Sequence, residues 1–286
     1  MKPNKSSIYS QNSYFWIPTY YDMDNDIYFC EPESKEFISS FYQKEYWDNF
    51  WSKRLVTNIL YKMAIWIVKI PDLLNYRNFQ VLKRLGYLNK NPKILEIWIW
   101  EWKNLTYLKK LWYNILWVEM DPENVKKINT LFNKEVVFQG NYEDIKLEWK
   151  YDIIYMRHVL EHFLDLEYVI NNLKNNLNEW WIVFIDVPFC ESDYTLKWSI
   201  FEHPHIYHFT KKSLNNLFEE GNFQNIYMEY YVRRNLNISR FNFINKIYVF
   251  ILMMLKLPSY KTGGNVQENG IYDLIWIFKL KETWKK

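Results

Sequence analysis

Residues 93–102 read Lys-Ile-Leu-Glu-Ile-Trp-Ile-Trp-Glu-Trp, and the order of residue types in this stretch decides how the chain folds. A short apolar strand carries Glu96 near its end, and tryptophans stand at 98, 100 and 102 where a helix would begin. Such a turn normally uses glycine, which tolerates a positive φ and lets a ligand approach without a Cβ in the way. With glycine at the three positions, the stretch becomes a strand, a carboxylate and a G-x-G-x-G loop that opens a helix.

The composition supports glycine at these positions. The chain has 15 Trp and 6 Gly in 286 residues, and moving every Trp to Gly would give 21 glycines, close to the roughly 20 that average usage predicts. Trp112 ends a helix-like run, and Trp180 and Trp181 precede an apolar strand, which are common places for glycine. We therefore hypothesise that UGA encodes glycine in the source organism and was translated as Trp.

Strands and helices alternate from residue 93 onward. We expect apolar strands at 93–97, 114–120, 136–140, 151–156 and 181–187, and helices at 102–111, 122–132 and 166–177. Asp121 followed by Pro122 is a typical helix start. The strands are nearly continuous in apolar residues, as in a parallel sheet covered by helices on both faces. The pattern predicts an α/β fold with a doubly wound, Rossmann-like sheet.

The last hundred residues depart from this alternation. After a histidine-rich loop at 188–209 we expect a helix from Thr210 to about Gly221 and then strands at 223–232 and 270–280, one of them antiparallel. An insertion at about 233–264 carries an apolar helix at 243–257, which suits the core, a cap or a homodimer contact. Residues 1–90, aromatic and irregular and then helical from about 44, are expected to form an N-terminal helical cap beside a main domain at 91–286.

Charge and cysteine content exclude several classes of protein. The net charge of +3 is nearly balanced and the lysines form no stripe, so no nucleic-acid partner is expected. Cys30 and Cys190 lie far apart in no metal-like spacing, which fits a reducing cytoplasm. The polar start has no secretory signal, and the apolar run 247–255 is too short for stable membrane insertion. We expect a cytoplasmic protein.

Polar residues follow the other predicted strands. Glu119 ends the second strand, 21 positions after Trp98, where a carboxylate can accept hydrogen bonds from both ribose hydroxyls of a nucleoside. Asn141 and Tyr142 follow the third strand, and Arg-His-Val-Leu-Glu-His at 157–162 follows the fourth. After the fifth strand, Phe-Glu-His-Pro-His-Ile-Tyr-His-Phe-Thr at 201–210 holds three of the five histidines of the chain.

With these motifs in this order, residues 93–280 resemble a class I S-adenosylmethionine-dependent methyltransferase, of the broad group with the ubiquinone-pathway and sugar methyltransferases. The resemblance implies S-adenosylmethionine as cofactor and a small-molecule acceptor, such as a sugar, a quinone precursor or a lipid-linked intermediate. Glu96 would contact the methionine part, Asn141 the adenine amine and Tyr142 the ring. The cofactor side would comprise Glu96, Trp98, Trp100, Trp102, Glu119, Met120, Asn141, Tyr142 and His158.

The histidine motifs are expected on the acceptor side. A histidine near neutral pKa can take the proton of an acceptor hydroxyl, and we expect this role for His205 first and for His208 second. Glu161 and His162 would line the floor of the site, or merely hold the start of a helix. Some ubiquinone-pathway members bind a divalent metal through E-x-x-E-H, but His158 replaces the first Glu here, so we expect no metal.

Two alternative interpretations of these motifs predict a different function. His158, Glu161 and His162 match the H-x-x-E-H signature of an inverted zinc peptidase, in which both histidines would share one zinc ion. If the loop tryptophans are real, their indoles would fill the cofactor cleft, and the chain would be a non-catalytic Rossmann-like binding module.

Overall fold

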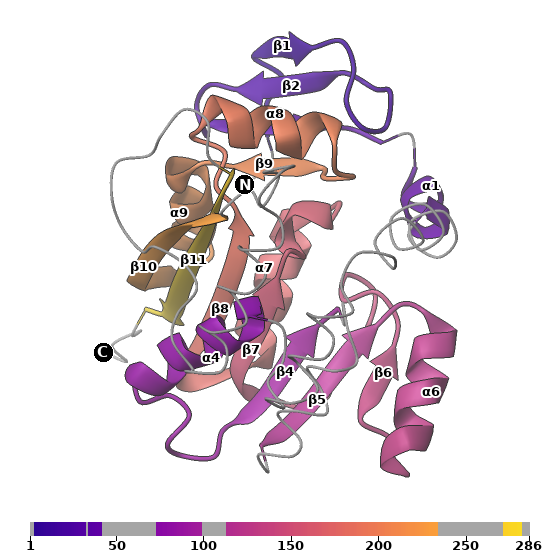
Figure 1. Cartoon of the computed structure of the whole chain (residues 1–286), viewed down its shortest axis with the longest axis vertical. Helices are drawn as coiled ribbons and strands as arrows, with labels where there is room; N and C mark the ends of the chain where they lie inside the picture. The colour runs from indigo at the N-terminus through magenta and orange to yellow at the C-terminus, as the bar shows by residue number, and fades with distance from the viewer. Residues whose placement is uncertain (1–2, 33, 42–72, 99–112, 234–270, 282–286) are drawn as a thin grey trace, which may run out of the picture.

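The computed structural model describes residues 3–32, 34–41, 73–98, 113–233 and 271–281. A large twisted sheet lies at the centre of this part of the chain, and a smaller sheet lies across one end of it (Figure 1). Several expectations from the sequence fall outside the described residues. They are the helices at 102–111 and 243–257, the insertion at about 233–264, residues 44–72 of the N-terminal helical segment, and Trp100, Trp102 and Trp112.

The large sheet has seven strands in the order β10-β11-β8-β7-β4-β5-β6. Its members are β4 (Lys93–Ile97), β5 (Asn114–Glu119), β6 (Val137–Gln139), β7 (Tyr151–Arg157), β8 (Leu177–Pro188), β10 (Phe223–Arg233) and β11 (Ile271–Leu280). Every pairing from β8 to β6 is parallel, and β11 runs antiparallel to both of its neighbours. The expected doubly wound sheet with one antiparallel strand near the C-terminus is confirmed.

Local sequence signals set the limits of the helices between these strands. Helix α6 (Pro122–Phe132) begins where the Asp121 side chain accepts a hydrogen bond from the Glu123 amide, and it ends at Asn133 in the left-handed region. Helix α9 (Lys211–Glu220) begins at Thr210, whose side chain accepts a hydrogen bond from the amide of Ser213. The starts and ends expected from sequence for both helices are therefore confirmed.

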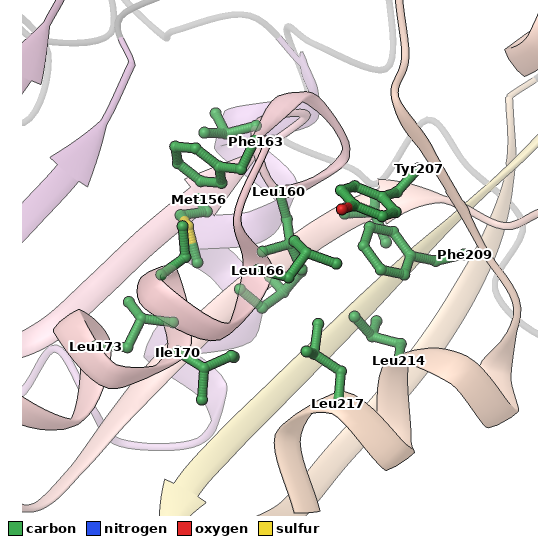
Figure 2. Packing of buried hydrophobic residues seen from close by; sticks show 14 of the residues in the cluster. Met156, Leu160, Phe163, Leu166, Ile170, Leu173, Tyr207, Phe209, Leu214 and Leu217 are labelled. Atoms are coloured by element: carbon green, nitrogen blue, oxygen red, sulfur yellow. The ribbon is translucent and has the colours of Figure 1, made fainter. Parts of the chain in front are cut away.

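Apolar side chains cover both faces of the large sheet. On one face α4 (Leu73–Arg84) and α6 contribute Leu82 and Ile128, which are buried against the strands. On the other face α7 (Leu166–Asn176) and α9 meet, as Figure 2 shows for residues including Leu173 and Leu217. Burying such a side chain stabilises the fold by roughly 1.5–3 kcal/mol, so the two layers hold the carboxyl ends of the strands in place.

The N-terminal residues form strands, where sequence analysis expected irregular structure. Strands β1 (Ser7–Ser10), β2 (Thr19–Asp22) and β3 (Ile27–Cys30) pair antiparallel, and β3 pairs in turn with β9 (Tyr207–Phe209). The aromatic residues of β2 and β3 are good strand formers, and Asp22 accepts hydrogen bonds from the amides that follow it to close the turn. A short helix, α1 (Lys35–Ser40), follows.

The segment expected to be a histidine-rich loop also contains regular structure. Helix α8 (Asp193–Phe201) begins at Ser192, whose side chain accepts a hydrogen bond from the Thr195 amide, and β9 follows shortly after. The small sheet thus ties the N-terminus to the segment that carries His205 and His208. None of the helices in the described part of the chain is long and apolar enough to cross a membrane.

Candidate active site

The cofactor loop begins directly after β4, at Trp98. Its backbone has φ 61°, in the left-handed region, and its amide donates to the carbonyl of Val118 on β5 at 2.9 Å. The indole packs against the rings of His162 and Phe163, with centroids 5.5 and 5.8 Å away. Glu96 lies two residues earlier, on β4. It is buried and accepts a hydrogen bond from Trp117 Nε1 at 2.7 Å. The loop position therefore lies against the expected acceptor side.

Three tryptophans adopt a positive φ, which is unusual for a bulky residue. Among the described non-glycine residues with positive φ, five are Asn, Asp or His, which tolerate this conformation, and the rest are Trp16, Trp98 and Trp180. Trp180 lies where the β7–β8 pairing shifts register. Its φ is 71° and that of Trp16 is 60°. For a bulky residue each of these is an outlier, whereas glycine adopts the conformation freely.

The residues expected to contact the ribose and the adenine lie at the end of β5 and just after β6. Glu119, at the end of β5, is buried, and its Oε1 accepts a hydrogen bond from the Asp121 amide at 3.0 Å. Met120, half-buried, packs against the main core cluster. Asn141 Nδ2 donates to Glu143, and Tyr142 is fully buried with its hydroxyl donating to Asn176. In this structure Tyr142 is a core residue, and its contact with a cofactor ring stays a prediction.

Glu143 connects the adenine side to the acceptor side and was not expected from sequence. Its Oε1 accepts hydrogen bonds from the amides of Leu164 and Asp165 at 2.8 and 2.7 Å, and its side chain is buried. A carboxylate within a polar turn carries no signal that distinguishes it from a surface residue. Only the fold shows that it fixes the segment after His162.

The residues at 158–162 leave the end of β7 without forming an α-helix. His158 has φ 50°, and its amide donates to the carbonyl of Asp186 at 2.7 Å. Glu161 and His162 belong to a one-turn 3-10 helix, Leu160–His162, and Glu161 Oε1 lies 3.2 Å from His158 Nδ1. A peptidase H-x-x-E-H motif needs both histidines on one α-helical turn, so the zinc-peptidase alternative is wrong.

The structure brings the expected acceptor-side residues together. His205 Nε2 lies 3.9 Å from Glu161 Oε1, and the His162 and His205 rings are 4.9 Å apart. His162 Nδ1 donates to the carbonyl of Pro204 at 3.0 Å. The hydroxyl of Ser199, on α8, lies 2.7 Å from His205 Nδ1 and 2.8 Å from His208 Nδ1. Ser199 was not expected from sequence because α8 itself was not.

A comparison with models of protein families identifies the family of the chain. Residues 73–228, more than half of the chain, match a family model described as a methyltransferase domain. The chain belongs to this methyltransferase family. Its cofactor is S-adenosylmethionine.

Solved structures similar to the methyltransferase share little sequence with it. A S-adenosylmethionine-dependent methyltransferase from Thermotoga maritima, described as a possible histamine N-methyltransferase, is 13% identical with a TM-score of 0.50, over 83% of this chain and 99% of its own. Another from Clostridium acetobutylicum is 10% identical with a TM-score of 0.46, over 72% and 92%. These likenesses concern the fold alone. No curated protein matches the chain in sequence.

Burial favours the neutral form of three histidines on the expected acceptor side of the methyltransferase. Burial lowers the pKa of His162 to about 4 and that of His208 to about 3. Burial and then the neighbouring histidines hold the pKa of His205 well below its ordinary value. Neutral imidazoles keep one nitrogen lone pair each, but such low pKa values make them weak proton acceptors. His205 alone is thus a poorer general base in this structure than the sequence suggested.

A second buried network joins α4 to the end of β8. Asp186 Oδ2 accepts a hydrogen bond from Asn78 Nδ2 at 2.8 Å, and Tyr231 donates to the same carboxylate at 3.2 Å. Arg157 Nε lies 3.9 Å away. Burial and the nearby Asp273 raise the pKa of Asp186 to about 6. This network was missed in sequence analysis because its members come from four separate elements.

The raised pKa of Asp186 predicts a pH-dependent stability. The folded chain takes up a proton at this carboxyl more readily than the unfolded chain, whose pKa is about 3.9. Its contribution is therefore greatest below about pH 4 and is lost as the pH rises through about 6. We expect Asp186→Asn to flatten the dependence of the melting temperature on pH in this window. The exposed carboxylate Asp144, changed to Asn, is the control, and equal pH curves for the two variants would contradict the assignment.

Proposed function

We propose that the methyltransferase transfers the methyl group of S-adenosylmethionine to a small-molecule acceptor, such as a sugar, a quinone precursor or a lipid-linked intermediate. The convergence of Glu161, His162 and His205 beside the loop position Trp98 carries this proposal. It supplies polar groups where the carboxyl ends of the strands place a ligand in such sheets. Their burial suits a site that excludes water.

We propose that the cofactor lies over the carboxyl ends of β4 and β5. Glu96 would contact its methionine part, Glu119 its ribose, and Asn141 and Tyr142 its adenine, with Met120 and His158 beside them. The buried position of Glu119 next to Trp98 supports this placement, because Trp98 N bonds to the strand that ends at Glu119. The carboxylate would be the anchor for the ribose diol.

We further propose that residues 98, 100 and 102 are glycine in the native protein, through the UGA reading. The left-handed backbone of Trp98 supports glycine at a position of the motif, and that of Trp16 and Trp180 supports the same substitution at positions outside it. We call the chain with glycine at 98, 100 and 102 the glycine-loop form. If tryptophan is native, the competing function is a non-catalytic binding module, since the indole of Trp98 already packs on His162.

The chemistry requires little beyond alignment and exclusion of water. The sulfonium carbon of the cofactor is already activated, so the protein must place the acceptor atom in line with it. In this proposal Glu161, His162, His205 and His208 activate the acceptor. The cap at 1–90 and the insertion at about 233–264 would enclose it beside the domain at 91–286. We propose no nucleic-acid partner, a cytoplasmic location and, through the insertion, a homodimer.

The ribose carboxylate provides the test of the cofactor placement. We expect Glu119→Ala, in the glycine-loop form, to weaken binding of S-adenosylmethionine and S-adenosylhomocysteine alike by one to two decades. Both ligands carry the same ribose diol, and a hydrogen bond to a charged group contributes roughly 1.5–3 kcal/mol. Isothermal titration calorimetry with each ligand measures the two affinities.

The exposed residue Glu123, four positions further along, gives the matched control. Glu123→Ala removes the same charge from the first turn of α6 and should leave both affinities unchanged. Unchanged affinities in Glu119→Ala would show that this carboxylate does not meet the ribose. A loss of thermal stability without ligand would instead give it a structural role, through its bond to the Asp121 amide.

A further inference from the structure

Three potential metal ligands from two separate segments converge at the acceptor side. Glu161 and His162 come from the 3-10 helix after β7, and His205 comes from the segment that leads into β9. One ligand atom from each lies within 4.8 Å of the others. The three residues are 0%, 3% and 4% exposed, so the group is enclosed by protein.

We propose that Glu161, His162 and His205 bind a divalent transition-metal ion of the zinc type. Two imidazole nitrogens and one carboxylate oxygen form a common three-residue set for zinc, and they leave a fourth position for a water or a ligand. This departs from the sequence expectation of no metal. The ligand set differs from E-x-x-E-H because His205 comes from a distant segment.

The hydrogen bonds around the cluster orient the imidazoles for a metal. The Pro204 carbonyl can only accept, so His162 Nδ1 carries the hydrogen and the lone pair of the neutral ring lies on Nε2. His205 Nδ1 meets the Ser199 hydroxyl at 2.7 Å, which leaves its Nε2 directed to Glu161. Metal-binding histidines almost always hold their second nitrogen in this way, which fixes the ring and its tautomer.

The charge of the cluster also suits a cation. A fully buried carboxylate is costly unless charge or hydrogen bonds compensate it, and a divalent ion would provide that charge. Zinc–ligand bonds of about 2.0–2.2 Å require the three ligand atoms to move closer together by about 1 Å.

The inference deepens the proposed function, and it rests on that function only in placing the ion on the acceptor side. An ion there would polarise an acceptor oxygen and favour its ionised form, a task for which the weakly basic histidines are poorly suited. The ion would share the space in front of Trp98 with the acceptor.

Metal titration of the glycine-loop form tests the site without an acceptor. The chelator-treated protein is titrated with Zn²⁺ by calorimetry and with Co²⁺ by visible absorption, which reports the coordination number. We expect one ion per chain with a four-coordinate Co²⁺ spectrum. His205→Ala and His162→Gln should each weaken metal binding at least about 10-fold. Even the loss of a group that only orients a metal ligand typically lowers metal affinity by about 10-fold or more.

His203 provides the matched control, because it lies in the same segment and its ring stacks 5.2 Å from that of His205 without joining the set. His203→Ala should leave metal affinity unchanged. The proposal would be overturned if the glycine-loop form without a histidine substitution bound no metal. It would also be overturned if His203→Ala and His205→Ala lost equal metal affinity. S-adenosylhomocysteine titrations of the same samples keep the two proposals apart. Cofactor binding without metal binding would refute the metal site alone. Metal binding without cofactor binding would refute the cofactor placement alone.

Discussion

The glycine-loop form is expected to bind S-adenosylhomocysteine, whereas the chain with tryptophan at 98, 100 and 102 is not. Trp98 follows β4 directly, and its indole packs against His162 and Phe163 in the space in front of the strand ends. Glycine removes this indole and accepts the observed φ of 61° without strain. Relief of one such backbone outlier also favours folding by roughly 1–3 kcal/mol. Calorimetric titration of both forms measures the difference.

A substitution outside the loop separates the effect on cofactor binding from the effect of relieving backbone strain. Trp180→Gly relieves the same kind of backbone, at φ 71°, at a position that is 61% exposed and outside the motif. It should raise the melting temperature without conferring cofactor binding. Equal binding by the tryptophan and glycine-loop forms would refute the account of the loop, and binding by neither would remove these residues from the cofactor site. Peptide mass spectrometry of the native protein identifies residue 98 directly, and tryptophan there would refute the recoding.

The parts of the fold that sequence predicted well are those fixed by local pattern. The central strands of the large sheet are buried on both faces, so their apolar runs stand out, as at Lys93–Ile97. Helix Pro122–Phe132 was expected with the limits observed, because Asp121 and Pro122 define its first turn chemically. Such signals need no knowledge of distant residues.

The missed elements depend on contacts between distant segments. Strand β9 has three residues and exists because β3, far away in sequence, pairs with it. The four-residue strands near the N-terminus gain stability from the same sheet, and their aromatic residues alone did not distinguish strand from irregular structure. The apolar residues of helix α8 show no clear helical periodicity, so the sequence pattern did not indicate a helix there.

The candidate site likewise combines residues that local sequence pattern predicts with residues that only the fold reveals. Its histidines were expected from their places after the fourth and fifth strands, and the structure brings His162 and His205 together. Ser199 and Glu143, which hold these segments by hydrogen bonds, were missed, because a serine or a glutamate is notable only once its partners are known. Burial of the cluster, which decides the protonation of its histidines, also emerges only from the packed fold.

His205→Ala is expected to lower turnover by roughly 10²–10⁴-fold, the usual cost of losing a group that assists proton removal from an acceptor. His205 lies 3.9 Å from Glu161 and beside His162, both of which we assign to the acceptor side. Cofactor affinity should therefore remain nearly unchanged. The measurement follows S-adenosylhomocysteine formation with an identified acceptor, in the glycine-loop form, together with calorimetric titration of the cofactor product.

Two further variants show whether the loss in His205→Ala is chemical or structural. His203→Ala removes the neighbouring ring of the same segment and should keep most of the turnover. Ser199→Ala removes the hydroxyl that meets both His205 and His208, so it should lower kcat with little change in KM, because it disturbs orientation and not acceptor contacts. Full turnover in His205→Ala would make this segment a structural support. A large fall in melting temperature together with weakened cofactor binding would point to the same conclusion, because the loss of an acceptor-side group alone should leave cofactor binding intact.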